Sequence, residues 1–178
     1  MDLGILVLRI ILVALLWGHA TQKLFGWFHG QGIGATAQLF ERWGLRPGRP
    51  FVILSGTAEI LGGALLLAGF LTPAGATIIV GSMTVAVAYN WAHGLWAHRG
   101  GYEVALVYGL LAIVVCLTGP GAYSLDASLG LDALSGPTWA AAAAAAGAAG
   151  ATVPILLRGR TVGRDAPGGD LSRDAAGT

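Results

Sequence analysis

Five long apolar segments constrain the fold of this chain more than any other feature of its sequence. They run Leu3–His19, Phe51–Leu71, Ala74–Trp91, Tyr102–Thr118 and Thr138–Leu157. A helix needs about 20 predominantly apolar residues to cross the hydrocarbon core of a bilayer. Only 11% of the residues are charged, against about 25% in soluble domains. The sequence predicts an all-α integral membrane protein, with a four-helix transmembrane bundle and a fifth C-terminal span.

The segments between the predicted spans suggest how the chain is organised. Residues 1–137 form the predicted four-helix core, and a short interfacial helix is expected near 35–44, where Leu39, Phe40 and Trp43 recur at helical spacing. Residues 138–157 are largely alanine, which contributes little to membrane insertion, so a surface helix or a mobile tail is the alternative. Residues 158–178 are polar and rich in glycine and aspartate, and predict a disordered cytoplasmic tail.

Basic residues predict the orientation in the membrane. With five alternating spans, all lysines and arginines outside the spans fall on one side, in the first connection, the third connection and the C-terminal tail. Basic loops favour the cytoplasmic side, so the N-terminus is expected outside and the C-terminus inside the plasma membrane. The chain begins Met-Asp, without a basic region or a small-residue cleavage site, so the first helix is expected to be retained.

Composition excludes several classes of function. The net charge of +1 and the lack of a basic stripe argue against nucleic-acid binding. The single cysteine, Cys116, cannot form an intramolecular disulfide, and its apolar span disfavours a reactive thiolate. The sequence also has no repeat of metal ligands, no phosphate-binding glycine loop and no nucleophile triad. We therefore expect no metal site, and the lipid bilayer is the first partner to expect.

Glu59 is the most informative polar residue, because an ionisable group inside a membrane is costly. It lies near mid-depth of the second predicted span, and Gly62 and Gly63 follow it where another helix could approach closely. One interpretation is an acid that handles protons or binds a ligand. The other is a structural residue that pairs with Arg9 or bonds to another helix.

Other polar residues are expected at the cytoplasmic ends of the spans, close to Glu59 in depth. A small amphipathic ligand would need such polar groups beside apolar walls. The alternatives are a snorkelling lysine, interfacial histidines, or, with less support, haem ligation by two histidines from different helices. The ligand-binding candidates, Glu59 included, are His19, Gln22, Lys23, Glu59, Asn90, His93, Tyr102 and Glu103.

Several motifs of the chain resemble those of the DoxX family of small bacterial membrane proteins. They are QKLFG in the first connection, AEILGG in the second span, GGYE before the fourth span and GPGAYSLD after it, within about residues 3–129. Ala20 stands where the family usually has glycine, and the fifth span extends beyond the four-helix family core. The resemblance implies a compact bundle and a link to redox biology. An archaeal relative is a subunit of a thiosulfate:quinone oxidoreductase, and a mycobacterial relative is associated with thiol and superoxide stress.

Two classes of function follow. The leading hypothesis is a redox-linked subunit that binds a quinone or similar amphipathic ligand and works with a partner oxidoreductase on the cytoplasmic face. His19, Lys23 or His93 would donate hydrogen bonds, and Glu59 or Glu103 would accept a proton. The alternative is a non-enzymatic anchor or assembly factor for a soluble redox or stress enzyme, possible also as an oligomer. A small-solute permease has less support, since no inverted repeat or broken helix pair is evident.

Overall fold

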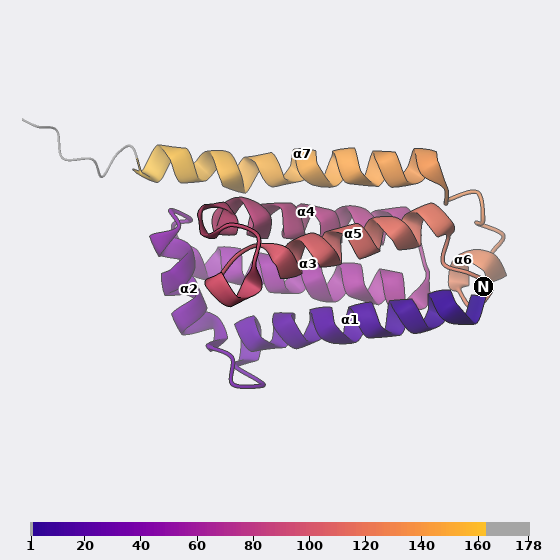
Figure 1. The fold of residues 1–178 in the computed structure, drawn as a ribbon, viewed down its shortest axis with the longest axis horizontal. Helices are drawn as coiled ribbons and strands as arrows, with labels where there is room; N and C mark the ends of the chain where they lie inside the picture. The colour runs from indigo at the N-terminus through magenta and orange to yellow at the C-terminus, as the bar shows by residue number, and fades with distance from the viewer. Residues whose placement is uncertain (1, 163–178) are drawn as a thin grey trace, which may run out of the picture.

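A bundle of long helices, seen in the computed structural model of Figure 1, makes up the described part of the protein. The structure describes residues 2–162, with side chains through residue 157, so the predicted tail at 158–178 falls almost entirely outside the described residues. The α-helices are α1 (Asp2–Phe25), α2 (Gly32–Arg42), α3 (Gly48–Ala68), α4 (Thr72–Asn90), α5 (Glu103–Thr118), α6 (Leu125–Ser128) and α7 (Pro137–Val162). Two 3-10 turns, η1 (Trp91–His93) and η2 (Ala97–Arg99), join α4 to α5.

Membrane-spanning character is confirmed for the bundle as a whole. Four of the described helices are long and apolar enough to cross a membrane: Asp2–Phe25, Gly48–Ala68, Thr72–His93 and Pro137–Leu157. The alanine-rich fifth segment meets this criterion, whereas α5, at 16 residues, is a shorter apolar helix. The two 3-10 turns η1 and η2 precede α5, so the helix found at the predicted span Tyr102–Thr118 is the shortest of the five long helices.

The two ends of the bundle differ in what they carry (Figure 1). The α2 end holds α2, the turn from α2 into α3 and the connection from α4 to α5, which together carry Arg42, Arg46, Arg49 and Arg99. The α6 end holds the N-terminus, the turn between α3 and α4, and α6. The connections with and without basic residues therefore lie at opposite ends, as strict alternation of the helices requires.

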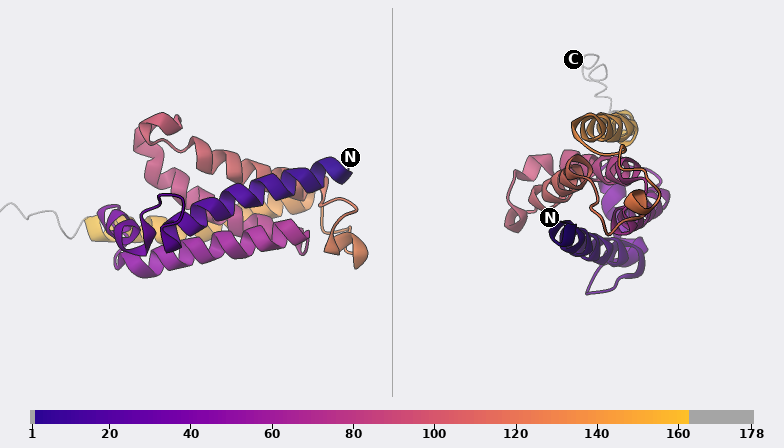
Figure 2. Two further views of the ribbon diagram at one scale, coloured as in Figure 1. Left: turned by 90° about the horizontal axis from the view of Figure 1, so that it is seen from below. Right: turned by 90° about the vertical axis from the view of Figure 1, so that its right-hand side faces the viewer.

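The helices pack around α4 and α1. Helix α4 contacts α3, α5 and α7, while α1 contacts α2, α3 and α5, and Figure 2 shows α7 on the opposite side of the bundle from α1. The core between them is built from fully buried apolar residues, which include Leu16, Leu66, Ile79 and Val115. Many other apolar side chains are exposed on the outside of the helices, which is the pattern expected of surfaces that face lipid.

Arg9 belongs to the first half of α1, which begins at the α6 end, and it is fully buried, at 1% exposure. Its guanidinium donates to the carbonyls of Leu66 and Leu67, at the C-terminal end of α3, and to those of Pro120 and Tyr123. The last carbonyls of a helix have no intrahelical donors, and they carry partial negative charge. The cation therefore satisfies helix-end and loop acceptors, so the predicted alternative of a pair with Glu59 is wrong.

Asp126 of α6 is a buried acceptor for backbone N–H groups at the same end of the bundle, where Arg9 is a buried donor to backbone carbonyls. It is 1% exposed, and its carboxylate accepts from the backbone N–H groups of Leu71 and Thr72, at 2.8 and 3.1 Å, and from the Thr72 hydroxyl at 2.7 Å. These groups begin α4, where unpaired N–H groups favour an anion. Arg9 and Asp126 thus stabilise the turn between α3 and α4 from two other parts of the chain.

Candidate ligand-binding site

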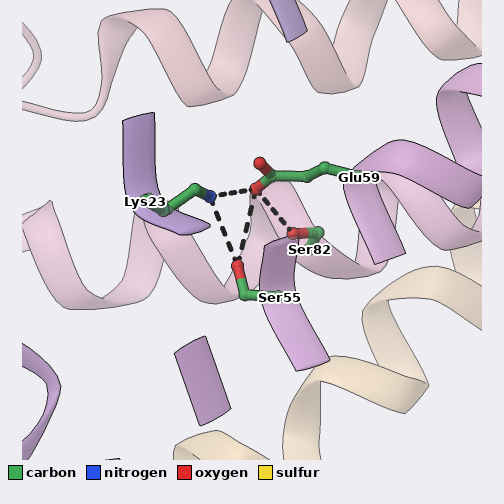
Figure 3. A network of polar contacts seen from close by, with 4 residues as sticks. All are labelled: Lys23, Ser55, Glu59 and Ser82. Atoms are coloured by element: carbon green, nitrogen blue, oxygen red, sulfur yellow. Dashed lines mark hydrogen bonds and ion pairs between the residues drawn. The ribbon is translucent and has the colours of Figure 1, made fainter. Parts of the chain in front are cut away.

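A network of four polar side chains joins three helices inside the bundle (Figure 3). The Lys23 ammonium lies 2.5 Å from Oε1 of Glu59 and 3.3 Å from the Ser55 hydroxyl. The hydroxyls of Ser82 and Ser55 lie 3.1 and 3.5 Å from the same carboxylate oxygen. All three neighbours therefore donate to Oε1 of Glu59, and the network links α1, α3 and α4.

Local helix geometry explains why these groups meet. Ser55 and Glu59 are four residues apart on α3, so they lie on the same helix face. Helix α1 runs on through Phe25, past the predicted end at His19, and this extension brings Lys23 alongside α3. Glu59 is 2% exposed and Lys23 is 25% exposed, so the acid is held within the bundle and the lysine reaches toward its edge.

The second oxygen of Glu59 has no partner among the described residues. Oε2 is buried and accepts no hydrogen bond, and in Figure 3 it points away from the other three side chains. Leaving a charged oxygen buried without a donor is costly. The Lys23 ion pair is therefore the main compensation for the Glu59 charge in the described structure.

A cavity of about 420 Å³ opens beside this network. The four network residues, Lys23, Ser55, Glu59 and Ser82, form one polar region of its lining, and Thr77 lies five residues before Ser82 on α4. The rest of the lining is predominantly apolar. Cavities of about 300–1,000 Å³ with a few placed polar groups are typical of small-molecule sites. The remaining lining residues are Phe40, Trp43, Leu45, Phe51, Leu54, Ala58, Ile78, Gly81, Val85, Ala86, Tyr89, Ala146, Gly147, Gly150, Ala151 and Pro154.

Aromatic rings close the cavity at the α2 end. Phe40 stacks on Trp43 with ring centres 5.3 Å apart, and Trp43 stacks on Tyr89 at 5.2 Å. The Tyr89 hydroxyl donates to the Pro154 carbonyl at 3.1 Å, which ties α4 to α7. Helix α2, the predicted interfacial helix, therefore also helps to line the cavity, through Phe40 and the Trp43 that follows its last turn.

Lys23 and Glu59 are the two sequence candidates that line this cavity. His19 lies in α1 with its ring edge-on to Tyr108 of α5, 5.6 Å between centres. The backbone of Gln22 lies against Gly30, which has no space for a side chain there. Neither His19 nor Gln22 contributes to the cavity wall, although both share a helix with Lys23.

The other candidates lie around the connection from α4 to α5. The Asn90 amide donates to the Ala86 carbonyl of its own helix at 2.9 Å, and His93 is exposed in η1. Tyr102 stacks on Trp91 with centres 5.0 Å apart, and Glu103 accepts from the Ala97 backbone N–H at 2.9 Å. These contacts stabilise the connection itself, and none of the four residues lines the cavity.

Sequence reasoning missed both serines and the α7 wall. The spacing of Ser55 to Glu59 was visible in the sequence, but a serine in an apolar helix commonly bonds its own backbone and carries little signal. Gly62 and Gly63 lie where α3 approaches its neighbours: a β-carbon would meet Ile79 of α4 at position 62 and Trp17 of α1 at position 63. These glycines set the helix spacing around the site.

Comparisons with known proteins agree with this architecture. The chain matches the DoxX family over residues 4–99, which is more than half of its length. It is 34% identical over 135 residues to the inner membrane protein YqjF of Escherichia coli, covering 70% of this chain and 91% of that protein. It is also 34% identical over 85 residues to an uncharacterized protein of Haemophilus influenzae, covering 44% of this chain and 62% of that protein. No solved structure matches significantly. The chain is a multi-pass membrane protein and belongs to the DoxX family.

Proposed function

We propose that this protein binds a quinone or a closely similar amphipathic ligand and works with a partner oxidoreductase. The observation that carries this proposal is the joining of an apolar cavity of about 420 Å³ to a lysine–glutamate pair with two serine hydroxyls. A quinone has an apolar ring with carbonyl oxygens that accept hydrogen bonds. Lys23, Ser55 and Ser82 are donors of the kind that such oxygens need.

The network suits proton-coupled chemistry as well as binding. Reduction of a quinone to a quinol takes up two electrons and two protons. The electrons would come from the partner enzyme, since the sequence holds no evident cofactor motif. Lys23 can present a proton to a ligand carbonyl, and Glu59 lies behind it within hydrogen-bond distance. The lysine, at 25% exposure, is the group through which protons would be replenished.

The partner would dock at the α2 end. That end carries Arg42, Arg46, Arg49 and Arg99, and by the positive-inside rule it would face the cytoplasm. A basic surface close to the membrane favours a partner with an acidic docking face. The N-terminus would then lie outside, and the cavity would lie on the cytoplasmic side of the bilayer's centre.

Binding is tested with the purified protein in lipid nanodiscs. Ubiquinone and menaquinone analogues with decyl tails are titrated while tryptophan fluorescence is recorded, because Trp43 lines the cavity and a bound quinone should quench it. We expect saturable quenching in the wild type. In Lys23→Met the quinone affinity obtained from the titration should fall at least about tenfold, a loss of about 1.4 kcal/mol in binding free energy. Glu103→Gln is the matched control, since that carboxylate lies outside the cavity. Equal affinity in wild type, Lys23→Met and Glu59→Gln would refute the site.

The anchor hypothesis remains the second candidate, because the network of Figure 3 also joins three helices. In that case the network would only stabilise the bundle, and the arginines of the α2 end would recruit the partner. Partner capture would then follow substitutions such as Arg46→Gln and Arg49→Gln and be insensitive to Lys23→Met. If Lys23→Met instead loses quinone binding while it still captures the partner, the result supports the ligand-binding proposal.

A further inference from the structure

Residues of α3 and α7 border the cavity at positions that are exposed on the outside of the bundle and belong to the membrane-spanning segments. Both helices line the cavity, and α4 forms the wall between them. On the rim, Leu54 of α3 is 65% exposed, and Ala146 and Gly150 of α7 are exposed. All three belong to segments long enough to span a membrane. In a membrane, an opening bounded by these residues would face lipid hydrocarbon.

The α7 wall of the cavity is made of small residues and a proline. They are Ala146, Gly147, Gly150, Ala151 and Pro154. Two of these glycines have different surroundings. A β-carbon at Gly147 would meet the Thr77 carbonyl at 2.8 Å and Val80 at 2.9 Å, whereas a β-carbon at Gly150 would meet nothing within 4 Å. Gly147 thus permits close packing of α7 on α4, while Gly150 leaves space at the opening.

The groove is also elongated. Its lining along α4 runs from Thr77 to Tyr89, which spans about 18 Å at 1.5 Å per residue. The hydrogen-bonding cluster of Ser55, Ser82 and Lys23 occupies one region of this length, and nearly all of the rest is apolar. This distribution fits a ligand with one polar head and one extended hydrocarbon tail.

We propose that the ligand enters sideways from the bilayer between α3 and α7, and that its hydrocarbon tail lies in this opening against Gly150. This inference rests on the proposed function, because it places the head of the ligand at Lys23, Ser55 and Ser82. The occupant is a single-tailed membrane amphiphile, for example a ring with one isoprenoid or alkyl chain. Transfer of the tail from lipid to the groove involves little hydrophobic gain, because both surroundings are apolar. The opening therefore determines access and shape, while the polar cluster determines head recognition.

Photolabelling tests the route directly. The probe is a decyl-tailed benzoquinone with a diazirine at the tip of the tail, applied to the protein in nanodiscs, with unlabelled decyl-tailed benzoquinone as competitor. We expect competed labelling in α3 near Leu54 and in α7 near Gly150, found by peptide mass spectrometry. Competed labelling confined to α1 or α5 would overturn the lateral route and leave the proposed function standing. Labelling that the competitor does not reduce anywhere would overturn the proposed function.

Variants of α7 give an independent measurement. Gly150→Leu should place a side chain in open space, so the fold should be kept while labelling at the α3 rim falls at least fivefold. Ala149→Leu adds a similar bulk at an exposed α7 residue that does not line the cavity, and should label like the wild type. Equal competed labelling of the α3 rim in Gly150→Leu and Ala149→Leu would refute the role of this opening.

Discussion

Removing the charge of Lys23 should destabilise the bundle more than removing the charge of Glu59. Glu59 is 2% exposed, and Lys23, at 2.5 Å, is its one cationic partner among the described residues. Breaking a buried ion pair by deleting one partner costs about 3–5 kcal/mol, because the other charge stays buried without compensation. Since Lys23 is 25% exposed and part of its interaction is screened by solvent, we expect about 2–3 kcal/mol for Lys23→Met.

The reverse substitution leaves a different residue behind. In Glu59→Gln the amide oxygen can still accept from Ser55 and Ser82, and the lysine can extend along the helix toward the interface. The expected cost is about 1 kcal/mol, the net value of one ordinary hydrogen bond. In the double variant Lys23→Met with Glu59→Gln, no charge is left buried. Its cost should therefore be at least about 1 kcal/mol below the sum of the two single costs, a coupling typical of residues in contact.

Reversible unfolding in mixed micelles, with increasing mole fraction of sodium dodecyl sulfate and detection by circular dichroism, measures these differences. Glu103→Gln serves as the matched carboxylate control and should remain within about 0.5 kcal/mol of the wild type, as most surface substitutions do. The reasoning would be refuted if Glu59→Gln cost as much as Lys23→Met, or if the single costs were additive in the double variant. Either result would mean that the pair does not compensate the buried charge.

Other parts of the structure give further predictions, each with its own measurement. Asp126→Ala removes an acceptor for two backbone N–H groups at the start of α4 and for one hydroxyl, so the same unfolding assay should show a loss of about 2–3 kcal/mol, and a loss below about 0.5 kcal/mol would contradict the capping role. Tyr89→Phe removes the hydrogen bond to Pro154 and should raise hydrogen exchange in α7 without changing that of α1. Equal exchange of α7 in the wild type and in Tyr89→Phe would show that this hydrogen bond does not hold α7 against α4. Cys116 is fully buried, so maleimide should label it only after unfolding, and Cys116→Ser should leave quinone binding unchanged. A green fluorescent protein fused to the C-terminus should fluoresce in cells if that end is cytoplasmic, and a dark fusion with an active periplasmic reporter would reverse the orientation.

The approximate depth of polar side chains in the bundle could be predicted from the sequence, because hydropathy indicates the spans. Lys23 and Glu59 were predicted at neighbouring depths, and the structure places their charged groups 2.5 Å apart. The rotation of each helix about its axis could not be predicted in the same way. These helices are apolar on nearly every face, so periodicity does not show which side meets a neighbour. Asn90 and Glu103, which were predicted beside the site, therefore lie outside the cavity.

The partners of Arg9 could not be predicted from the sequence either. As the one basic residue inside a predicted span, it was the natural partner to consider for Glu59. Yet it lies 14 residues before Lys23 on α1, about 21 Å along the helix, so one carboxylate cannot reach both cations. Its real acceptors are main-chain carbonyls at the α6 end. Backbone acceptors leave no trace in the sequence, and only the end of α3 and the course of the chain through 120–123 reveal them.

The cavity draws its walls from two unequal parts of the chain. The polar network comes from α1, α3 and α4, all within the 4–99 segment that defines family membership, whereas the small-residue wall comes from α7, beyond that segment. Under the proposed function, recognition of the ligand head and the fit of its tail are therefore encoded in separate parts of the chain. A chimaera that exchanges α7 alone is then expected to change which tail is accepted while keeping the same head.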